Sequence, residues 1–312
     1  MIYLNNQVDS SLIARAAELI RNGRLVAFPT ETVYGLGADA LNPAAVRRIF
    51  ESKGRPSTSP LIVHVDSVEM ARTLVTAWPD SAAKLAARHW PGPLTLVLPK
   101  APHVPSEVTA GLATVGIRMP AHPVALALIT AAGVPIAAPS ANRFTELSPT
   151  TAEHVRVSLG DRVDMVLDGG STPVGIESTV VSLAANPPVL FRPGMITREE
   201  IEALIGPVSL PNERPSQAHP SPGLHPRHYS PRTTLLLVSG GHLPAHGRGI
   251  YLSHLPGGGQ PMPSLAREYA AILYATLHNL DQQRLDWIAV ETPPDTEEWA
   301  GVRDRLKRAS TF

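Results

Sequence analysis

The sequence predicts an α/β protein with a large first domain, a proline-rich linker and a small second domain. Patterns typical of strands and helices alternate up to about residue 205, without internal repeats. The stretch 211–232 has no periodicity and carries six prolines, which make it stiff and extended. The alternation resumes at residue 233. We therefore divide the chain into domains 1–210 and 233–312 and the linker 211–232.

The elements of the first domain follow from periodicity and capping residues. Asn42 as N-cap, Pro43 at the first helical position and Gly54 at the end predict a helix directly before Arg55. The other expected helices are 11–22, 67–76, 80–89, 123–132, 150–159 and 197–204, and the expected strands are 25–28, 61–65, 94–98, 114–120, 135–138, 165–167, 175–181 and 189–194.

The second domain is expected to be a small parallel α/β unit. Its strands are predicted at 233–239, 249–253 and 287–291, and its helices at 264–280 and 296–309. It contains neither a GxGxxG loop nor a Walker A lysine motif. We therefore do not assign it a nucleotide site of its own.

Composition limits the possible partners. The 312 residues are 43% hydrophobic, which supports a substantial core, and 27 basic residues balance 27 acidic ones. This overall charge balance does not indicate a protein that binds nucleic acid or membranes. Any site for a polyanion must therefore come from a local cluster of basic residues. No cysteine is present, which excludes thiolate catalysis, disulfides and cysteine metal sites. Without a signal-like N-terminus or a membrane-length apolar run, a cytoplasmic protein without membrane contact is expected.

Cations and hydroxyls recur at the predicted ends of strands and helices, where α/β sheets build their sites. Taken singly, each is more often a solvated helix end or an ordinary cap. If these ends converge, they form a cationic pocket for several oxyanions, because arginine forks and hydroxyls bind carboxylate and phosphate. The cations are Lys53, Arg55, Arg118, Arg143 and Arg192, and the hydroxyls belong to Thr32, Ser59, Ser140, Ser148 and Ser178.

Five strings of the sequence resemble the YrdC-like family, whose long members are threonylcarbamoyl-AMP synthases. They are PTETVYGLG at 29–37, KGRPSTSPLIVHV at 53–65, WPGPLT at 90–95, SANR at 140–143 and SPGLHPRHYSP at 221–231. The resemblance implies a twisted mixed sheet in the large domain and a Rossmann-like small domain. It also implies a linker that lies across the mouth of the active site.

The resemblance further implies an activity. Family enzymes condense L-threonine, bicarbonate and ATP, with Mg²⁺, into threonylcarbamoyl-AMP and pyrophosphate. The product passes to a tRNA-modifying protein complex that acts on an adenosine beside the anticodon, so binding of tRNA itself is expected to be weak or indirect.

The resemblance also implies site residues. The threonine pocket would comprise Thr32, His64, Arg118, Ala138 and Ser178, with Arg118 holding the carboxylate. ATP would contact Lys53, Arg55, Ser59, Thr114, Ser140, Asn142, Ser148 and Arg192, while Tyr229 closes over the nucleotide. Lys53, Arg55 and Arg118 are the candidate catalytic residues; the metal ligands stay unassigned.

The absence of a cysteine and of an evident Ser-His-Asp set argues against a covalent enzyme intermediate. The protein is expected to position substrates, balance charge and exclude water. We expect His64 to orient a group by a hydrogen bond rather than act as a base. Phe144-Thr145 follows SANR where family members often have glycine, so a positive φ at Thr145 would be strained.

Two other interpretations stay open. Short YrdC-like proteins have been linked to structured RNA, which suggests a binding module without catalysis; the neutral charge and the 5% aromatic content weigh against it. Hydrogenase maturation proteins embed a similar domain for carbamoyl transfer. Those proteins carry acylphosphatase-like and zinc-binding segments, and neither is evident in this cysteine-free chain.

Overall fold

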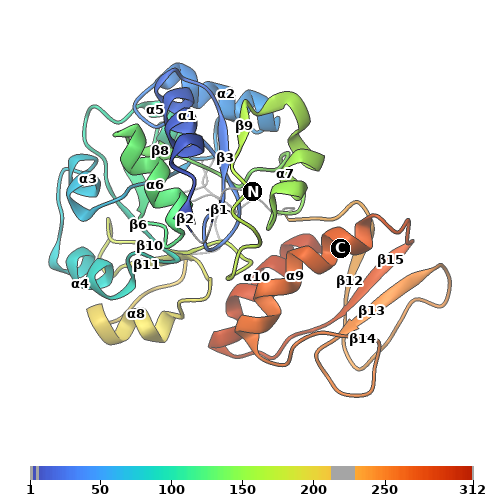
Figure 1. Ribbon diagram of the computed structural model, residues 1–312. Helices are drawn as coiled ribbons and strands as arrows, with labels where there is room; N and C mark the ends of the chain where they lie inside the picture. The colour runs from blue at the N-terminus through green and yellow to red at the C-terminus, as the bar shows by residue number, and fades with distance from the viewer. Residues whose placement is uncertain (1–2, 5–6, 212–228, 311–312) are drawn as a thin grey trace.

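The computed structural model describes residues 3–4, 7–211 and 229–310, which form two sheets with their covering helices (Figure 1). One sheet has nine strands and the other has four, and each lies in its own α/β unit. Mixed and parallel α/β units in this order confirm the predicted fold class. The predicted boundaries at 210 and 233 stay a prediction, because residues 212–228 of the predicted linker lie outside the described residues.

The large sheet is mixed, in the order β11-β10-β6-β7-β5-β8-β4-β3-β9. It combines antiparallel pairs such as β6 with β7 and parallel pairs such as β5 with β7. Its strands are β3 (Val26–Phe28), β4 (Gly35–Asp39), β5 (Ile62–His64), β6 (Leu94–Pro99), β7 (Thr114–Arg118), β8 (Ile136–Ala137), β9 (Met165–Val166), β10 (Thr179–Ser182) and β11 (Val189–Arg192). A separate short pair, β1 (Tyr3–Leu4) with β2 (Gln7–Val8), precedes it.

Alternate residues of the central strands enter two different cores, as the period of two along a strand requires. Val26 and Phe28 of β3 pack with α1 and α6, whereas Ala27 faces the larger core on the other side. The helices are α1 (Ser10–Arg21), α2 (Pro43–Lys53), α3 (Val68–Thr73), α4 (Asp80–His89), α5 (Ser106–Thr109), α6 (Pro123–Ala132), α7 (Ala152–Leu159), with the 3-10 turn Gly160–Arg162 after it, and α8 (Arg198–Ile205).

Strand register brings distant residues of the predicted site together. The parallel pairing of β5 with β7 sets His64 opposite Arg118. An isolated bridge joins Gly35, at the start of β4, to Ser140 after β8. Helix α2 ends at Gly54 in the left-handed conformation, with φ 63°, so the chain turns sharply and Arg55 enters the interior. Five segments of the chain therefore converge at one region of the sheet.

The small sheet is parallel throughout, in the order β12-β15-β13-β14, as predicted for the second domain. Its helices α9 and α10 lie between this sheet and the large domain in Figure 1. Their apolar faces share one core with Val33, Leu147 and Ile176 of the large domain, so the two units are packed together. The elements are β12 (Thr234–Val238), β13 (Gly249–Ser253), β14 (Gln260–Pro261), α9 (Ala266–Asp281), β15 (Trp287–Glu291), the 3-10 turn Glu297–Trp299 and α10 (Ala300–Ala309).

Some local predictions were wrong in detail. The elements β1, β2, β4, α5 and β14 were missed. Four of them have only two to four residues, which is too short to show a period. Strand β4 was missed because its sequence, GLGAD, carries two glycines, which are depleted in strands. The N-cap of α7 is Thr151 rather than Thr150, since it is the Thr151 hydroxyl that accepts from His154 N. No helix among the described residues is both long and apolar enough to cross a membrane.

Candidate functional site

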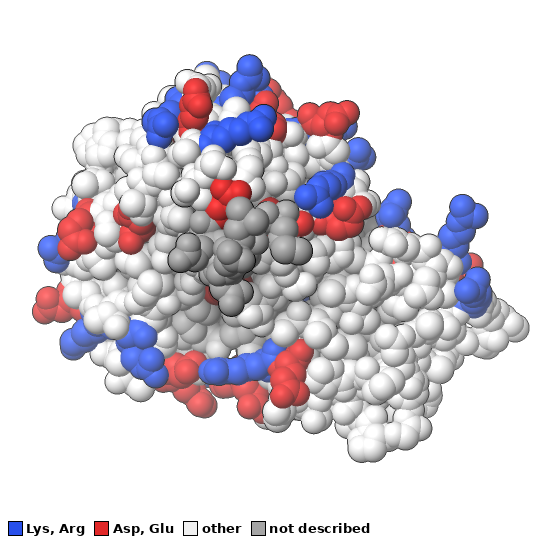
Figure 2. Space-filling model, in the orientation of Figure 1, with Lys and Arg blue, Asp and Glu red and all other residues white. Residues whose placement is uncertain are grey.

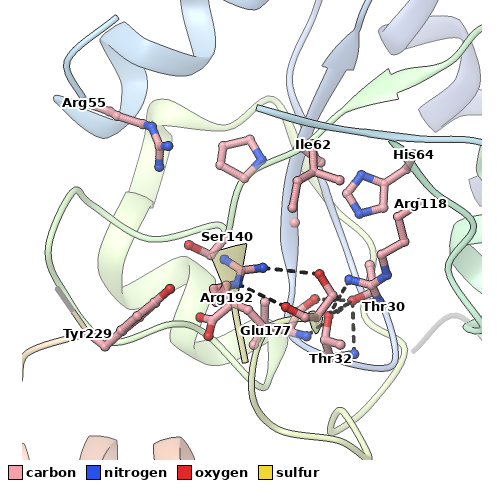
Figure 3. Close-up of a pocket in the computed structure, with 15 residues that line it drawn as sticks. Thr30, Thr32, Arg55, Ile62, His64, Arg118, Ser140, Glu177, Arg192 and Tyr229 are labelled. Atoms are coloured by element: carbon pink, nitrogen blue, oxygen red, sulfur yellow. Dashed lines mark hydrogen bonds between the residues drawn. The ribbon is translucent and has the colours of Figure 1, made fainter. Parts of the chain in front are cut away.

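A pocket opens where the polar ends of the large sheet meet Tyr229 (Figure 3). His64 and Arg118 lie on one side of it, and Arg55 and Tyr229 lie on the opposite side. The lining residues come from eight separate stretches of the chain, so only folding assembles the pocket. They are Thr30, Thr32, Val33, Gly35, Arg55, Ile62, His64, Arg118, Ala138, Pro139, Ser140, Glu177, Ser178, Arg192 and Tyr229.

Arg118 is held rigidly at its side of the pocket. Its Nη2 lies 2.7 Å from the Glu31 carboxylate in an ion pair whose side chains are 4% and 7% exposed. Nη1 donates to Thr32 Oγ1 at 2.9 Å, and Nε donates to the Gly92 carbonyl at 3.2 Å. The guanidinium is therefore preorganised, and its planar fork suits a carboxylate. The Arg118 side chain is buried at the pocket.

His64 is a neutral histidine beside Arg118. Burial, and secondly the positive charge of Arg118, lower the pKa of His64 to about 3. Its ring meets Phe28 edge-on, with the centroids 6.1 Å apart. A neutral imidazole can orient a substrate group by a hydrogen bond, while its low basicity makes it a poor general base at neutral pH.

Arg55 and Arg192 supply positive charge to the rest of the pocket. Arg55 donates from Nη2 to the Pro60 carbonyl at 3.2 Å, but its buried Nε has no hydrogen-bond partner among the described residues. Burial lowers the pKa of Arg55 to about 10, so the side chain stays charged at neutral pH. Arg192 donates to the Ser178 carbonyl at 3.0 Å and to Ser178 Oγ at 3.2 Å. Arg55 is thus a buried cation with donor capacity left for a ligand.

Lys53 is buried behind the pocket wall. Its Nζ donates to the Ser140 carbonyl at 2.5 Å and to the Asn142 carbonyl, and burial lowers the pKa of Lys53 well below its usual value. The ammonium thereby ties the C-terminal end of α2 to the loop after β8. In this structure Lys53 shapes the loop that carries Ser140.

The structure brings most of the predicted site residues together. All members of the predicted threonine set line the pocket, as do Arg55, Ser140, Arg192 and Tyr229 of the predicted ATP set. Arg143 does not join the cluster, because its exposed side chain donates to the Ser158 carbonyl instead. The remaining ATP candidates lie outside the described lining: Lys53, Ser59, Thr114, Asn142 and Ser148. The assigned roles of all these residues stay predictions.

Asn142 and Ser148 support the lining from behind. Asn142 Nδ2 donates to the Arg143 and Glu146 carbonyls, each at 2.9 Å, which closes the loop on itself. Ser148 donates from Oγ to Glu177 at 2.5 Å.

The sequence prediction missed two carboxylates, Glu31 and Glu177. Both are buried, and Glu177 lines the pocket itself. The prediction was made for an anion site, so it considered cations and hydroxyls and left out the acidic residues beside them, Glu31 and Glu177. Charge balance could have revealed the two carboxylates, because arginines that are buried in a folded protein need nearby negative charge.

The local charge balance remains positive even with these acids. Five buried cations, Lys53, Arg55, Arg118, Arg192 and Arg305, surround or support the pocket, against the carboxylates of Glu31 and Glu177. Burying unbalanced charge is costly unless an opposite charge arrives. The pocket is therefore suited to an anionic small molecule.

The donor set does not form a protein cage for a metal ion. The described part of the chain contains no group of three His, Asp or Glu side chains arranged to hold one. Glu177, the one carboxylate lining the pocket, already accepts from Arg305 at 2.7 Å. Any Mg²⁺ would therefore have to enter with the phosphates of a nucleotide, which is a usual mode of Mg²⁺ binding.

Thr145 adopts the strained conformation that the sequence suggested. Its φ is 71°, which is unusual for a β-branched residue. The Thr145 carbonyl accepts from Ser230 N at 2.9 Å, so the loop 143–148 is joined to the residue after Tyr229. Tyr229 also has a positive φ, of 60°. Two of the four non-glycine residues with positive φ in the described part of the chain therefore lie where the loop 143–148 meets Tyr229.

Fold and pocket define a two-domain α/β protein with a buried cationic site for small anionic molecules. Residues 18–194 match the Sua5/YciO/YrdC family, described as telomere recombination, and residues 196–311 match the threonylcarbamoyl-AMP synthase C-terminal domain. The chain belongs to the threonylcarbamoyl-AMP synthase family, in its two-domain Sua5 form.

Three relatives support this assignment. The chain is 43% identical to the threonylcarbamoyl-AMP synthase of Bacillus subtilis, over 96% of this chain and 92% of that protein. It is 48% identical to the enzyme of the same name from Pyrococcus abyssi, over 77% of this chain and 72% of that protein. The crystal structure of Pyrococcus abyssi Sua5 complexed with L-threonine superposes with a TM-score of 0.91 at 39% identity, covering 97% of this chain and 95% of that one.

Proposed function

We propose that the protein condenses L-threonine, bicarbonate and ATP into threonylcarbamoyl-AMP and pyrophosphate. The observation that carries the proposal is one pocket with two cationic regions, Arg118 on one side and Arg55 with Arg192 elsewhere. An amino-acid carboxylate and a triphosphate are two anions that must lie side by side in this reaction. The name shared by the relatives, and the threonine bound by one of them, support the same conclusion.

At the first region, the guanidinium of Arg118 would pair with the threonine carboxylate. Thr32, Ser178 and neutral His64 line the same pocket and could hydrogen-bond the amine and hydroxyl of the substrate. The threonine nitrogen attacks the carbon of bicarbonate-derived CO₂ and loses a proton, which forms a carbamate. Holding the reactants together removes much of the entropic barrier to this step.

At the second region, Arg55 and Arg192 would balance the charge of the triphosphate. A carbamate oxygen attacks the α-phosphorus in line, and the bond from this phosphorus to the bridging oxygen breaks. Pyrophosphate leaves with that oxygen and its electron pair. The arginines stabilise the developing negative charge, while Mg²⁺ enters as part of the MgATP substrate. Transfer of the adenylyl group makes the enzyme a nucleotidyltransferase.

Water must be kept from the carbamate and from the mixed anhydride, because both hydrolyse readily. Tyr229 lines the pocket and is 1% exposed, which suits a side chain that covers the bound nucleotide. We infer that threonylcarbamoyl-AMP is then delivered to a tRNA-modifying protein in the cytoplasm. This delivery step and the location rest on the family resemblance.

Release of pyrophosphate from purified protein tests the proposal. We expect it to require ATP, threonine and bicarbonate together, with AMP appearing in a threonine-containing product. Serine and valine, each lacking one group of threonine, serve as matched controls. Equal rates of pyrophosphate release with and without threonine would reject the proposed function.

An RNA-binding role without catalysis has no support from the visible surface. Figure 2 shows positive and negative side chains interspersed on this face rather than gathered into a basic patch. Electrostatic binding of RNA needs such a patch. Filter binding to tRNA over a salt series, without substrates, is expected to show weak binding.

A further inference from the structure

Arg305 is the point at which the small domain contacts the pocket of the large one. It lies on α10, is 1% exposed and is among the largest fully buried side chains. Nε donates to Glu177 Oε2 at 2.7 Å, and Nη2 donates to the Glu177 carbonyl at 3.0 Å. Nη1 donates to the Pro193 carbonyl at 2.8 Å. One guanidinium from the second domain therefore ties together two segments of the first.

In both of these segments, a residue adjacent in sequence to the contact lines the pocket. Glu177 precedes Ser178, and Pro193 follows Arg192. Arg192 in turn donates to the Ser178 carbonyl at 3.0 Å. The donors of Arg305 thus fix the ends of β10 and β11 relative to each other, and with them the cation at this side of the pocket.

The same guanidinium also supports the aromatic wall. It lies over the ring of Tyr229 at 5.4 Å, a distance at which a cation and a π system attract. The ring of Tyr229 packs against Tyr274 of α9 with centroids 6.0 Å apart, and Tyr274 donates to Glu177 at 3.2 Å. Glu177, Tyr229 and Arg192 all line the pocket, whereas Arg305, which contacts the first two, is not itself among the described lining residues.

The backbone contact at this point is close. A Cβ added at Gly301 of α10 would lie 2.9 Å from the Gly194 carbonyl oxygen. Helix α10 therefore lies so close to the turn after Arg192 that there is no room for a side chain at Gly301. This close approach lets Arg305 reach the Pro193 carbonyl. Such an approach leaves little freedom for the guanidinium to shift.

The carboxylate at the carboxyl edge of the small sheet is fully occupied by donors of the same domain. There Glu291 accepts from Gly240 N at 2.8 Å, from Gly241 N at 3.3 Å and from the Tyr251 hydroxyl. The backbone donors that an anion would need are thus occupied by a side chain of the same sheet. The small domain therefore reaches the pocket through its helices, by Arg305 of α10 and by the Tyr274 hydroxyl of α9.

We propose that Arg305 is a positioning residue for the nucleotide side of the pocket, acting through Glu177, Arg192 and Tyr229 across the domain interface. The inference rests on the proposed function. It assigns the small domain a part in the reaction without contact between that domain and the substrates. Among the described residues, Arg305 makes no hydrogen bond or ion pair with Arg118, around which the threonine side is built.

The test compares Arg305→Lys and Arg305→Met with the wild-type protein in the pyrophosphate assay. Lysine keeps the charge but cannot donate to Glu177 and Pro193 together. We expect KM for ATP to rise about tenfold in Arg305→Lys and further in Arg305→Met, with kcat lowered and KM for threonine within twofold. Arg303→Ala is the matched control, because Arg303 lies on the same helix with its side chain 36% exposed and pairs with Asp295.

A merely structural role gives a different pattern. Loss of folded protein lowers kcat in proportion and leaves both KM values unchanged, which would overturn the proposal. Arg305→Met leaves Glu177 as an unpaired buried charge, so Arg305→Met with Glu177→Gln restores charge balance and controls for folding. If Arg305→Met does not fold, the lysine variant decides. Absence of threonine-dependent pyrophosphate release by the wild-type protein instead rejects the proposed function, so the two failures are distinguishable.

Discussion

The two sheets of this protein differ in whether a buried charged group beside them has all of its hydrogen-bond partners. At the edge of the small sheet, Glu291 is fully used by Gly240, Gly241 and Tyr251. At the large sheet, Arg55 keeps a buried Nε with no partner among the described residues. A protein that leaves a charged donor unused accepts a cost in stability. The comparison teaches that incomplete compensation, rather than polarity alone, distinguishes a ligand site from a structural cluster.

The largest effect is expected from Arg118→Ala. Removal of a guanidinium from a buried charge pair should lower kcat/KM for threonine by about 10²- to 10³-fold, because the carboxylate and Glu31 both lose their partner. Steady-state kinetics with threonine varied measures this loss. The double variant with Glu31→Gln should recover folding stability but not threonine use. Recovery of both would assign Arg118 to stability alone.

Arg55→Ala is expected to have a smaller effect on catalysis than Arg118→Ala, and it should not destabilise the free protein. KM for ATP should rise about 10- to 100-fold, the value of one or two charged hydrogen bonds. The melting temperature of the free protein should be unchanged or higher, because burial of this cation lowers its pKa to about 10 and is uncompensated. Arg47→Ala is the control, since Arg47 lies on α2 and is 55% exposed. A large fall in stability with unchanged KM for ATP would mean that Arg55 is a structural residue rather than a ligand-binding one.

The pH dependence of stability tests the neutral state of His64. The unfolded chain takes up a proton at this residue near pH 6.5, whereas the folded protein does so only near its pKa of about 3. The free energy of unfolding should therefore fall as pH drops from 6.5 towards 3, by about 1.4 kcal/mol per pH unit from this group. Chemical denaturation at pH 7 and pH 5 should show a loss of about 2 kcal/mol that His64→Gln lacks. Identical losses in both proteins would contradict the assignment.

The smallest effect is expected at the small sheet. Glu291→Gln should lower the free energy of unfolding by about 1 kcal/mol, because charge-assisted hydrogen bonds to Gly240, Gly241 and Tyr251 become neutral ones. Denaturant unfolding measures the stability, and the pyrophosphate assay should give kinetic constants within twofold of wild type. A clear change in KM for ATP would mean that this cluster also takes part in the reaction.

Local features were predictable because short-range physics decides them. Asn42, Pro43 and Gly54 bound α2 as predicted, since capping depends on side chains within one turn. The capping box of Thr197 and Glu200 forms for the same reason. The strained Thr145 followed from its place in a loop where glycine is usual.

Long-range placement was harder to predict. Lys53 and Arg55 were both assigned to ATP from the string KGRPSTSPLIVHV. The turn at Gly54 sends their side chains to different partners. Arg143 failed to join the pocket for a similar reason, as its loop turns it towards Ser158. Sequence spacing gives the order of cations along the chain and leaves their directions open.

By itself, the sequence determined the alternation of strands and helices, the caps, the family resemblance and most of the residues that line the pocket, because each depends on local composition or on recurring strings. Only the tertiary structure decided which charges meet. The ion pairs Arg118 with Glu31 and Arg305 with Glu177 join residues 87 and 128 positions apart, and they form because strand register and domain packing bring them together.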